Sequence, residues 1–347
     1  MLSNFREALH TVFAGKIYMI SEKTNKFRSL NKNELITINT ICQLFQDNKD
    51  KIQILYRGES KTTLEDKLDE SYGSYKFFER LFFMGDKAKF FFKETSSSIE
   101  NRKYLQSISA VDDETFKFIF KSLHYIFTSE DIIRESKQIE LNRFKTDEFR
   151  FVQFFSDLTN VNKFLDAKKY EVLKTEENLI RLRDYYLYLL HTYGMENASL
   201  FVSTSMKRNV AKKFTNKDKG IVLWYFIPKP THYYGVSYLS FQESQAIICE
   251  YCNLPTYDKC FYPQDDEVSI KGALFPHFIL GIEDRLDKKF VVNPHIFKQT
   301  ENHIPLIPQK GLFINQENFS DMIINSGYAG YVTRWNDNGL YSNTFYR

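Results

Sequence analysis

The stretch FVSTSMKRNVAKKF, residues 201–214, marks the point at which the chain changes from helix-forming to strand-forming sequence. It begins as a short apolar strand, ends that strand with three hydroxyl residues, and continues into a basic segment typical of a helix start. One hydroxyl is enough to cap a helix. Capping therefore explains only one hydroxyl of the triplet Ser203, Thr204 and Ser205, and we expect the other two to contact another part of the chain.

The sequence before this stretch is mainly helical. Apolar residues recur at helical spacing in YKFFERLFFMGDKAKFFFKE (75–94), TFKFIFKSLHYIF (115–127), FRFVQFFSDL (149–158) and NLIRLRDYYLYLLHTYG (178–194). Residues 1–50 predict two further helices, at 4–14 and 32–45, with the strand-like KIYMIS (16–21) between them.

Strand patterns lie on both sides of the long helical block. KIQILYRGES (51–60) precedes the block and alternates apolar and polar side chains. Short β-rich runs separated by turn residues follow it: ASLFVSTS (198–205), GIVLWYFIP (220–228), GVSYLSF (235–241), QAIICEY (245–251), DEVSI (266–270), HFILGIE (277–283) and KFVVN (289–293). The tail predicts a helix near residues 316–325 and a last run, GYAGYVTRW (327–335).

This order predicts an α+β fold with a mixed or antiparallel β-sheet and a large helical insertion after its first strand. We expect a helical N-terminal segment at 1–50, a β-rich core from 51–60 and 194–347, and the insertion at 61–193.

The composition is that of a globular protein. Of 347 residues, 43% are hydrophobic and 26% charged, and the formal net charge is +3. The 33 Phe and 22 Tyr are too many to be exposed, so we expect them to form the core. No apolar run approaches the roughly 20 residues that cross a bilayer, and MLSNFREALHTVFAGK (1–16) does not resemble a signal peptide. With only four Cys, these features predict a cytoplasmic protein without membrane contact.

Metal and nucleotide motifs are not found in the sequence. Cys249, Cys252 and Cys260 lie close together, but a fourth ligand at regular spacing is missing, so buried thiols are the better interpretation. The seven His have no metal-ligand spacing. A phosphate loop and a dinucleotide fingerprint are also missing, which excludes a doubly wound nucleotide-binding sheet.

Three separate features could meet if the sheet brings the strand ends together. These are YRG (56–58), the hydroxyl triplet, and the acidic strand start in QDDEVSIKGALFPHFILGIE (264–283). An Arg on an early strand, then STS followed by Ala211 and Phe214, then an acid two residues before Glu267, resembles the arginine-serine-glutamate class of NAD-dependent ADP-ribosyltransferases. The resemblance covers about 52–58 and 199–283, and it leaves out the helical block and the tail.

The resemblance implies roles for three residues around bound NAD. Cleavage of the bond between nicotinamide and ribose passes through an oxocarbenium-like state, so the Glu267 carboxylate would stabilise positive charge and accept a hydrogen bond from the ribose 2′-hydroxyl. The planar guanidinium of Arg57 would bind the phosphates. Gly58, which has no side chain, would let the backbone approach the nicotinamide amide.

The resemblance also assigns the remaining residues. Ser203 would hydrogen-bond to the catalytic carboxylate and hold it in place. Thr204 and Ser205 would brace the strand end and cap the next helix, and Phe214 corresponds to the ring that packs near nicotinamide in the family.

Two features depart from the family pattern. Asp265 stands where members that modify arginine carry Glu or Gln, and its side chain is shorter by one methylene. Glu243 in FQESQAII (241–248) lies at a separation from Ser205 that also suits the catalytic position. We prefer Glu267, because the sequence around it matches the strand-turn-strand pattern better, and Glu243 stays open as the alternative.

The resemblance implies a mono-ADP-ribosyltransferase that acts as an intracellular toxin in phage defence and is restrained by a protein antitoxin. The mildly basic charge and Asp265 favour nucleic acid, in particular messenger RNA, as the acceptor. Two alternatives stay open: transfer to a protein side chain, and a non-catalytic RNA- or partner-binding module on the same fold.

Overall fold

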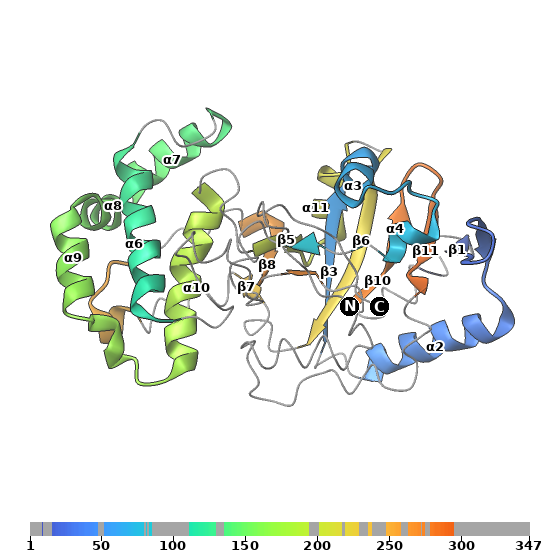
Figure 1. The fold of residues 1–347 in the computed structure, drawn as a ribbon, viewed down its shortest axis with the longest axis horizontal. Helices are drawn as coiled ribbons and strands as arrows, with labels where there is room; N and C mark the ends of the chain where they lie inside the picture. Colours follow the sequence, from blue (N-terminus) through green and yellow to red (C-terminus); the bar gives the residue numbers. More distant parts are fainter. Residues whose placement is uncertain are drawn as a thin grey trace, which may run out of the picture.

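The computed structural model describes fourteen parts of the chain: residues 9, 16–47, 52–79, 81, 83–84, 111–129, 135–193, 201–216, 219–228, 235–237, 248–257, 263–271, 273–274 and 278–294. They form an α+β structure in which a mixed β-sheet and a group of helices lie side by side (Figure 1). Apart from Leu9, the helix expected at 4–14 lies outside these residues, as do the helix expected at 316–325, the strand expected at 327–335 and Glu243.

The main sheet contains nine strands among the described residues, in the order β2-β1-β11-β10-β6-β3-β5-β8-β7. Among these described strands, only β1 and β11 pair in parallel, and all other neighbours are antiparallel. The strands are β1 Ile17–Ile20, β2 Phe27–Ser29, β3 Ile52–Glu59, β5 Phe201–Ser205, β6 Ile221–Pro228, β7 Gly235–Ser237, β8 Glu267–Lys271, β10 Ile279–Asp284 and β11 Lys289–Val292. A small second sheet pairs β4 Phe83–Met84 with β9 Ala273–Leu274.

The centre of the sheet is buried on both faces. Strand β6 is a continuous apolar run in which side chains of both orientations are buried, as expected for a central strand. Leu55 in β3 is also fully buried, although its side chain lies on the other face of the strand from those of Ile54 and Tyr56. Helix α11 (Arg208–Lys213) covers part of one face by packing on β3, β5 and β6.

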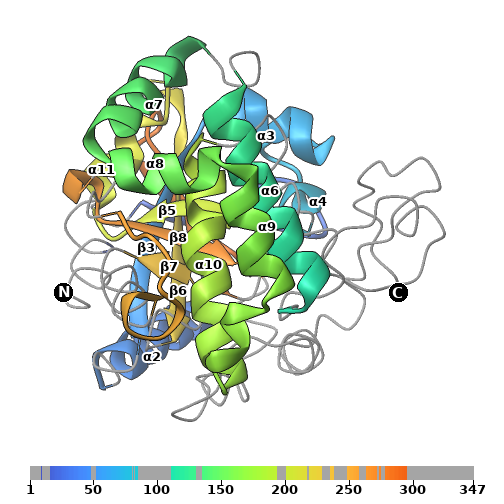
Figure 2. The same cartoon turned by 90° about the vertical axis from the view of Figure 1, so that its left-hand side faces the viewer.

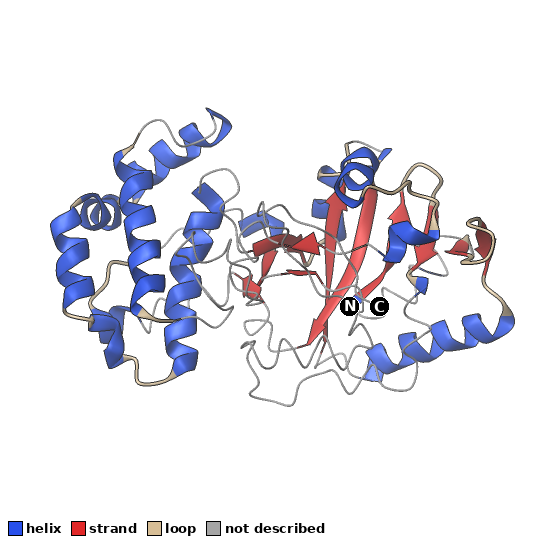
Figure 3. Cartoon of the chain, in the orientation of Figure 1, coloured by secondary structure: helices blue, strands red, loops and turns tan. Residues whose placement is uncertain are grey.

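The helices α6 to α10 form a separate group beside the sheet, which we call the helical lobe (Figure 3). Its members are α6 Asp113–Thr128, α7 Glu135–Asp147, α8 Phe149–Ser156, α9 Leu158–Asp166, the 3₁₀ helix η3 Lys169–Val172 and α10 Glu176–Tyr193. Local sequence sets two of their starts: Asp112 accepts a hydrogen bond from the backbone N–H of Thr115 at 2.9 Å at the start of α6, and Asp157 accepts one from the backbone N–H of Thr159 at the start of α9.

Aromatic rings fill the lobe, which explains part of the high Phe and Tyr content. The ring of Phe120 on α6 lies 5.5 Å from Phe155, 5.3 Å from Phe164 and 5.1 Å from Tyr186 between ring centroids. Helix α10 joins the lobe to the sheet, because it packs on α6 and also contacts β7 (Figure 2).

Several sequence predictions need correction. The segment 75–94 is not one helix: its described part is a short helix, α4 Tyr75–Glu79, followed by β4, whose pairing with β9 takes residues 83–84 into a sheet. The strand expected at 245–251 is wrong over its described part, because Ile248–Cys252 forms a π-helical turn, η6, that packs on η3.

The expected segment boundaries also differ from the arrangement observed. Residues 17–29 supply β1 and β2 to the main sheet, while α2 (Lys32–Asp47) agrees with the helix expected at 32–45. Within the expected insertion at 61–193, helices α3 (Lys61–Leu68) and α4 lie near the main sheet, and the helical lobe begins only at α6 (Figure 1).

No helix in the described part of the chain combines the length and the apolarity needed to span a membrane.

We predict that Gly281→Ala destabilises the sheet. A Cβ at Gly281 would lie 2.5 Å from the carbonyl oxygen of Val291 and 2.7 Å from the Phe290 ring, so the neighbouring strand must shift. The free energy of unfolding in urea should fall by about 1–3 kcal/mol. In the matched control Gly73→Ala, the new Cβ would lie 3.8 Å from its nearest neighbour, and the stability should be unchanged or slightly higher. Equal stability of Gly281→Ala and the wild-type protein would contradict this packing.

Candidate active site

The main sheet opens between strands β3 and β5. These strands pair only at Tyr56 and Ser205, whereas β3 pairs with β6 along its whole length and β5 pairs with β8 along its whole length. In Figure 1, β3 and β6 stand upright as an antiparallel pair, with β5 and β8 on the side of β3 that faces away from β6. Because a continuous ladder would close this gap, the divergence creates room for a cavity at the strand ends.

A cavity of about 570 Å³ occupies this opening. Its volume is in the range of small-molecule binding sites. It brings together every candidate site residue that the sequence singled out except Glu243: Arg57, Gly58, Ser203, Thr204, Ser205, Phe214, Asp265 and Glu267 line it. Other lining residues include Tyr56, Glu59, His191 and Thr192.

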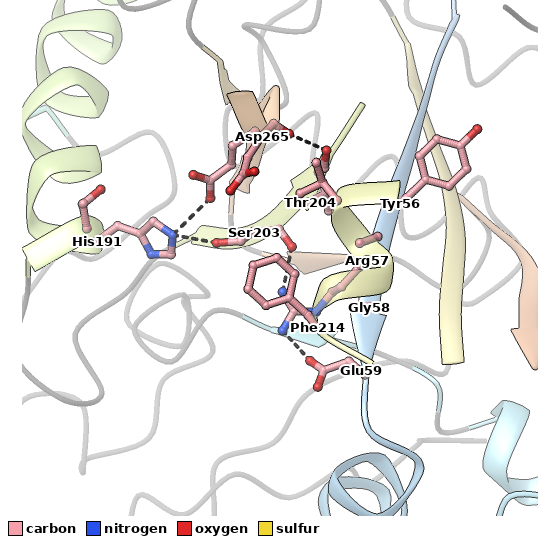
Figure 4. Close-up of a pocket in the computed structure, with 14 residues that line it drawn as sticks. Tyr56, Arg57, Gly58, Glu59, His191, Ser203, Thr204, Phe214 and Asp265 are labelled. Carbon is pink, nitrogen blue, oxygen red and sulfur yellow. Dashed lines mark hydrogen bonds and ion pairs between the residues drawn. The ribbon is translucent and has the colours of Figure 1, made fainter. Parts of the chain in front are cut away.

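Arg57 holds the two diverging strands together. Its Nη1 donates a hydrogen bond to the backbone carbonyl of Ser203 at 2.7 Å, and its Nη2 lies 2.5 Å from Oε1 of Glu59 (Figure 4). The side-chain bond to Ser203 thus connects β3 and β5 where the backbone ladder is absent. The guanidinium side chain remains 21% exposed at the cavity, which leaves part of it open to a ligand.

The hydroxyl triplet connects strand β5 to the β8 segment and to the start of helix α11. Thr204 donates to the carbonyl of Val268 at 2.5 Å, and Ser205 donates to the carbonyl of Asp265 at 2.5 Å, so both brace β5 against the β8 segment. Ser205 also accepts from the backbone N–H of Lys207 at 2.9 Å, one residue before α11. The spare hydroxyls of the sequence therefore fix the strand end.

Gly58 and Phe214 lie together at one wall of the cavity. A Cβ on Gly58 would be 1.8 Å from the carbonyl oxygen of Ala211 and 3.2 Å from the Cβ of Phe214. The glycine therefore lets α11 pack directly on β3. Phe214 ends α11 with 63% of its surface exposed, which leaves an aromatic face at the cavity (Figure 4).

The carboxylate of Glu267 receives hydrogen bonds from two sides. Tyr188 on α10 donates its hydroxyl to Oε2 at 2.9 Å, and Ser269 on β8 donates to Oε1 at 2.9 Å. His191, also on α10, places Nε2 3.8 Å from Oε1. The side chain of Glu267 is only 18% exposed, so these neighbours determine its charge state.

These contacts keep Glu267 ionised. Burial by itself would raise the pKa of the carboxyl group, but the neighbouring His191 ring, with the hydroxyls of Ser203 and Ser269, outweighs it and lowers the pKa to about 2. The Ser203 hydroxyl is thus one of the groups that lower this pKa. At neutral pH the cavity contains a fixed negative charge from Glu267.

Asp265 lies two residues before Glu267 in a 3₁₀ turn (η7, Pro263–Asp265). Its Oδ1 is 3.2 Å from Nζ of Lys213 on α11, while its backbone carbonyl accepts from Ser205. Asp265 and Glu267 thus line the same cavity in different surroundings.

Tyr188 and His191 were not predicted from the sequence. Both lie on α10, and His191 Nε2 is 2.9 Å from Oγ of Ser203. The seven His show no metal-ligand spacing, and that pattern carries no sign of a carboxylate partner. The available signal was the spacing of three residues, which places Tyr and His on one face of the helix that immediately precedes the hydroxyl triplet.

Metal binding has no support among the described residues, which contain no cluster of three or more His, Cys, Asp or Glu side chains arranged to hold an ion. Cys252 is buried, and this burial raises the pKa of its thiol to about 11. The side chains of Cys249 and Cys260 lie outside the described part.

Comparison of the chain with protein-family models, curated proteins and solved structures finds no match.

We predict that Glu267→Gln flattens the acid limb of the stability curve. The folded pKa of Glu267 is depressed from 4.5 to about 2, so its stabilising contribution is complete above pH 4.5 and is lost as the pH falls toward 2. In that window the free energy of unfolding of the wild-type protein should rise by about 1.4 kcal/mol per pH unit more than that of the variant.

Urea unfolding at pH values from 2.5 to 4.5, which lie inside this window, measures the difference. The matched control is Glu22→Gln at an exposed turn, which should keep the wild-type slope. Parallel curves for Glu267→Gln and the wild-type protein would contradict the depressed pKa.

Proposed function

We propose that this chain is an NAD-dependent mono-ADP-ribosyltransferase of the arginine-serine-glutamate class, built on an ADP-ribosyltransferase-like core. The observation that carries the proposal is that an arginine and an ionised glutamate from distant parts of the chain line one cavity at a sheet opening. Arg57, Ser203 and Glu267 are the residues on which the sequence resemblance rests, and they surround about 570 Å³ of space. The resemblance requires that these three residues lie together, and their shared cavity supports it.

The cavity offers suitable groups for a dinucleotide. Arg57 supplies a positive charge for the two phosphates, and the exposed ring of Phe214 supplies a stacking face for a flat aromatic group such as nicotinamide. Gly58 has no side chain and so lets α11 pack on β3, which brings Phe214 to the cavity beside Arg57. These three residues would hold NAD, with Glu267 facing the ribose.

The charge state of Glu267 fits the reaction. NAD supplies an ADP-ribose group whose bond to nicotinamide breaks with positive charge on the ribose. A carboxylate that stays ionised stabilises that charge electrostatically. With a pKa of about 2, Glu267 is a weak proton acceptor, so we assign it charge stabilisation and a hydrogen bond to the ribose 2′-hydroxyl.

We further propose RNA as the acceptor, within a phage-defence toxin that acts in the cytoplasm and is restrained by a protein antitoxin. Asp265 supports the choice over a protein arginine, because its shorter side chain is drawn to Lys213 at 3.2 Å. The net charge of +3 is compatible with a polyanionic acceptor. Transfer to protein, or binding of RNA without turnover, are the outcomes that would replace this proposal.

The test is transfer of label from radiolabelled NAD to separate pools of RNA, DNA and cell protein. We expect label in RNA, and about a hundredfold to a thousandfold less with Glu267→Gln, because the developing charge loses its stabilising partner. Glu22→Gln serves as the control and should label RNA like the wild-type protein. Label in protein alone would replace the acceptor, and no label with no released nicotinamide would overturn the enzyme proposal.

Replacement of Arg57 tests whether its guanidinium binds the phosphates of NAD. Arg57→Lys keeps the charge but loses the planar fork that contacts both Ser203 and Glu59, so we expect the KM for NAD to rise about tenfold or more. The matched control is Arg28→Lys, which alters an equally bidentate arginine, paired with Glu34 away from the cavity. Its KM should equal that of the wild-type protein. An unchanged KM in Arg57→Lys would contradict phosphate binding by Arg57.

A further inference from the structure

The carboxylate of Glu267 depends on a part of the chain that the sequence resemblance does not include. Two of the side chains that support it, Ser203 and Ser269, come from the strands β5 and β8. The other two, Tyr188 and His191, come from α10, which belongs to the helical lobe. Figure 4 shows His191 pointing from α10 toward Ser203.

The contacts of His191 exclude one obvious alternative. A serine, a histidine and a carboxylate in contact suggest a hydrolase triad, in which the two ring nitrogens contact different partners. Here the same atom, Nε2, lies 2.9 Å from Ser203 Oγ and 3.8 Å from Glu267 Oε1. A single nitrogen cannot both accept a proton from the serine and be oriented by the carboxylate. The arrangement therefore suits support of Glu267 and does not suit a serine nucleophile.

We propose that His191 and Tyr188 are positioning residues that orient the Glu267 carboxylate toward the cavity, so that helix α10 of the lobe completes the active site. Tyr188 fixes Oε2 by its hydroxyl at 2.9 Å. His191 approaches Oε1, the oxygen that also accepts from Ser269. With both oxygens engaged from different sides, rotation of the carboxylate would break at least one contact.

The surroundings of His191 hold it in this place. Its ring packs edge-on against Phe201 of β5, with 5.7 Å between centroids, and its side chain is only 16% exposed. The charged groups that share the cavity are Arg57, Glu59 and Asp265. Arg57 contacts Glu59 and Asp265 contacts Lys213, whereas the His191 ring lies beside the Glu267 carboxylate.

This inference rests on the proposed function only for its catalytic consequence. The supporting role itself can be measured without NAD. Titration of the Glu267 carboxyl carbon by ¹³C NMR, identified as the resonance missing from Glu267→Gln, reports its midpoint directly. In the wild-type protein the midpoint should lie near the pKa of about 2.

We expect His191→Leu to raise this midpoint by about one pH unit or more, because it removes a donor and a positive charge. His191→Gln, which keeps a hydrogen-bond donor, should restore part of the difference. Tyr188→Phe removes one hydroxyl with little change of volume and should also raise the midpoint, so the test stands even if His191→Leu folds poorly. The control is His124→Gln on α6, whose ring nitrogen contacts the carbonyl of Phe155 inside the lobe. It should leave the midpoint unchanged.

The activity readout separates this inference from the proposed function. With NAD, His191→Leu should lower kcat about a hundredfold with a small change in KM, because a misplaced carboxylate affects the transition state more than binding. A raised midpoint without NAD consumption by the wild-type protein would support the positioning role and overturn the proposed function. NAD consumption with an unchanged midpoint in both His191→Leu and Tyr188→Phe would overturn the positioning role.

Discussion

The single pairing between Tyr56 and Ser205 is the constraint on which the site depends. Beyond this point β3 and β5 separate, and the bond from Arg57 to the Ser203 carbonyl replaces the missing ladder. The separation exposes polar side chains of two strands to one space, and the guanidinium that spans it is charged and directional. A sheet that stayed paired along β3 and β5 would have no cavity at this position.

Helix α11, the β8 segment and the helical lobe stabilise this opening from different sides. Helix α11 packs directly on β3 because Gly58 has no side chain, and it ends with Phe214 at the cavity. Thr204 and Ser205 fasten β5 to the β8 segment. On the opposite side, Tyr188 and His191 reach the carboxylate from the lobe. The sheet and the lobe thus both contribute to one site, with a positive group and a negative group at fixed places.

The sequence predicted the α+β class, the main strands and the residues that meet in the cavity, because strand alternation and turn residues are local signals. It could not predict that β3 and β5 share one pair of residues, since register is a property of the folded sheet. The strand expected at 245–251 failed because a short apolar run fits a strand and a buried helical turn equally well. His191 was missed because its partner, Ser203, lies on the next element and only the folded chain brings the two together.

The most direct measurement is a titration of the Glu267→Gln protein with NAD, in which binding is monitored by the NMR resonances of the Arg57 side chain and the Phe214 ring. Glu267→Gln should slow turnover and allow the complex to accumulate. The account predicts that NAD shifts both resonances together and with one affinity, and that Arg57→Lys weakens this binding. Saturating NAD that shifts neither resonance, or binding that is insensitive to Arg57→Lys, would contradict the claim that the opening between β3 and β5 is a dinucleotide site.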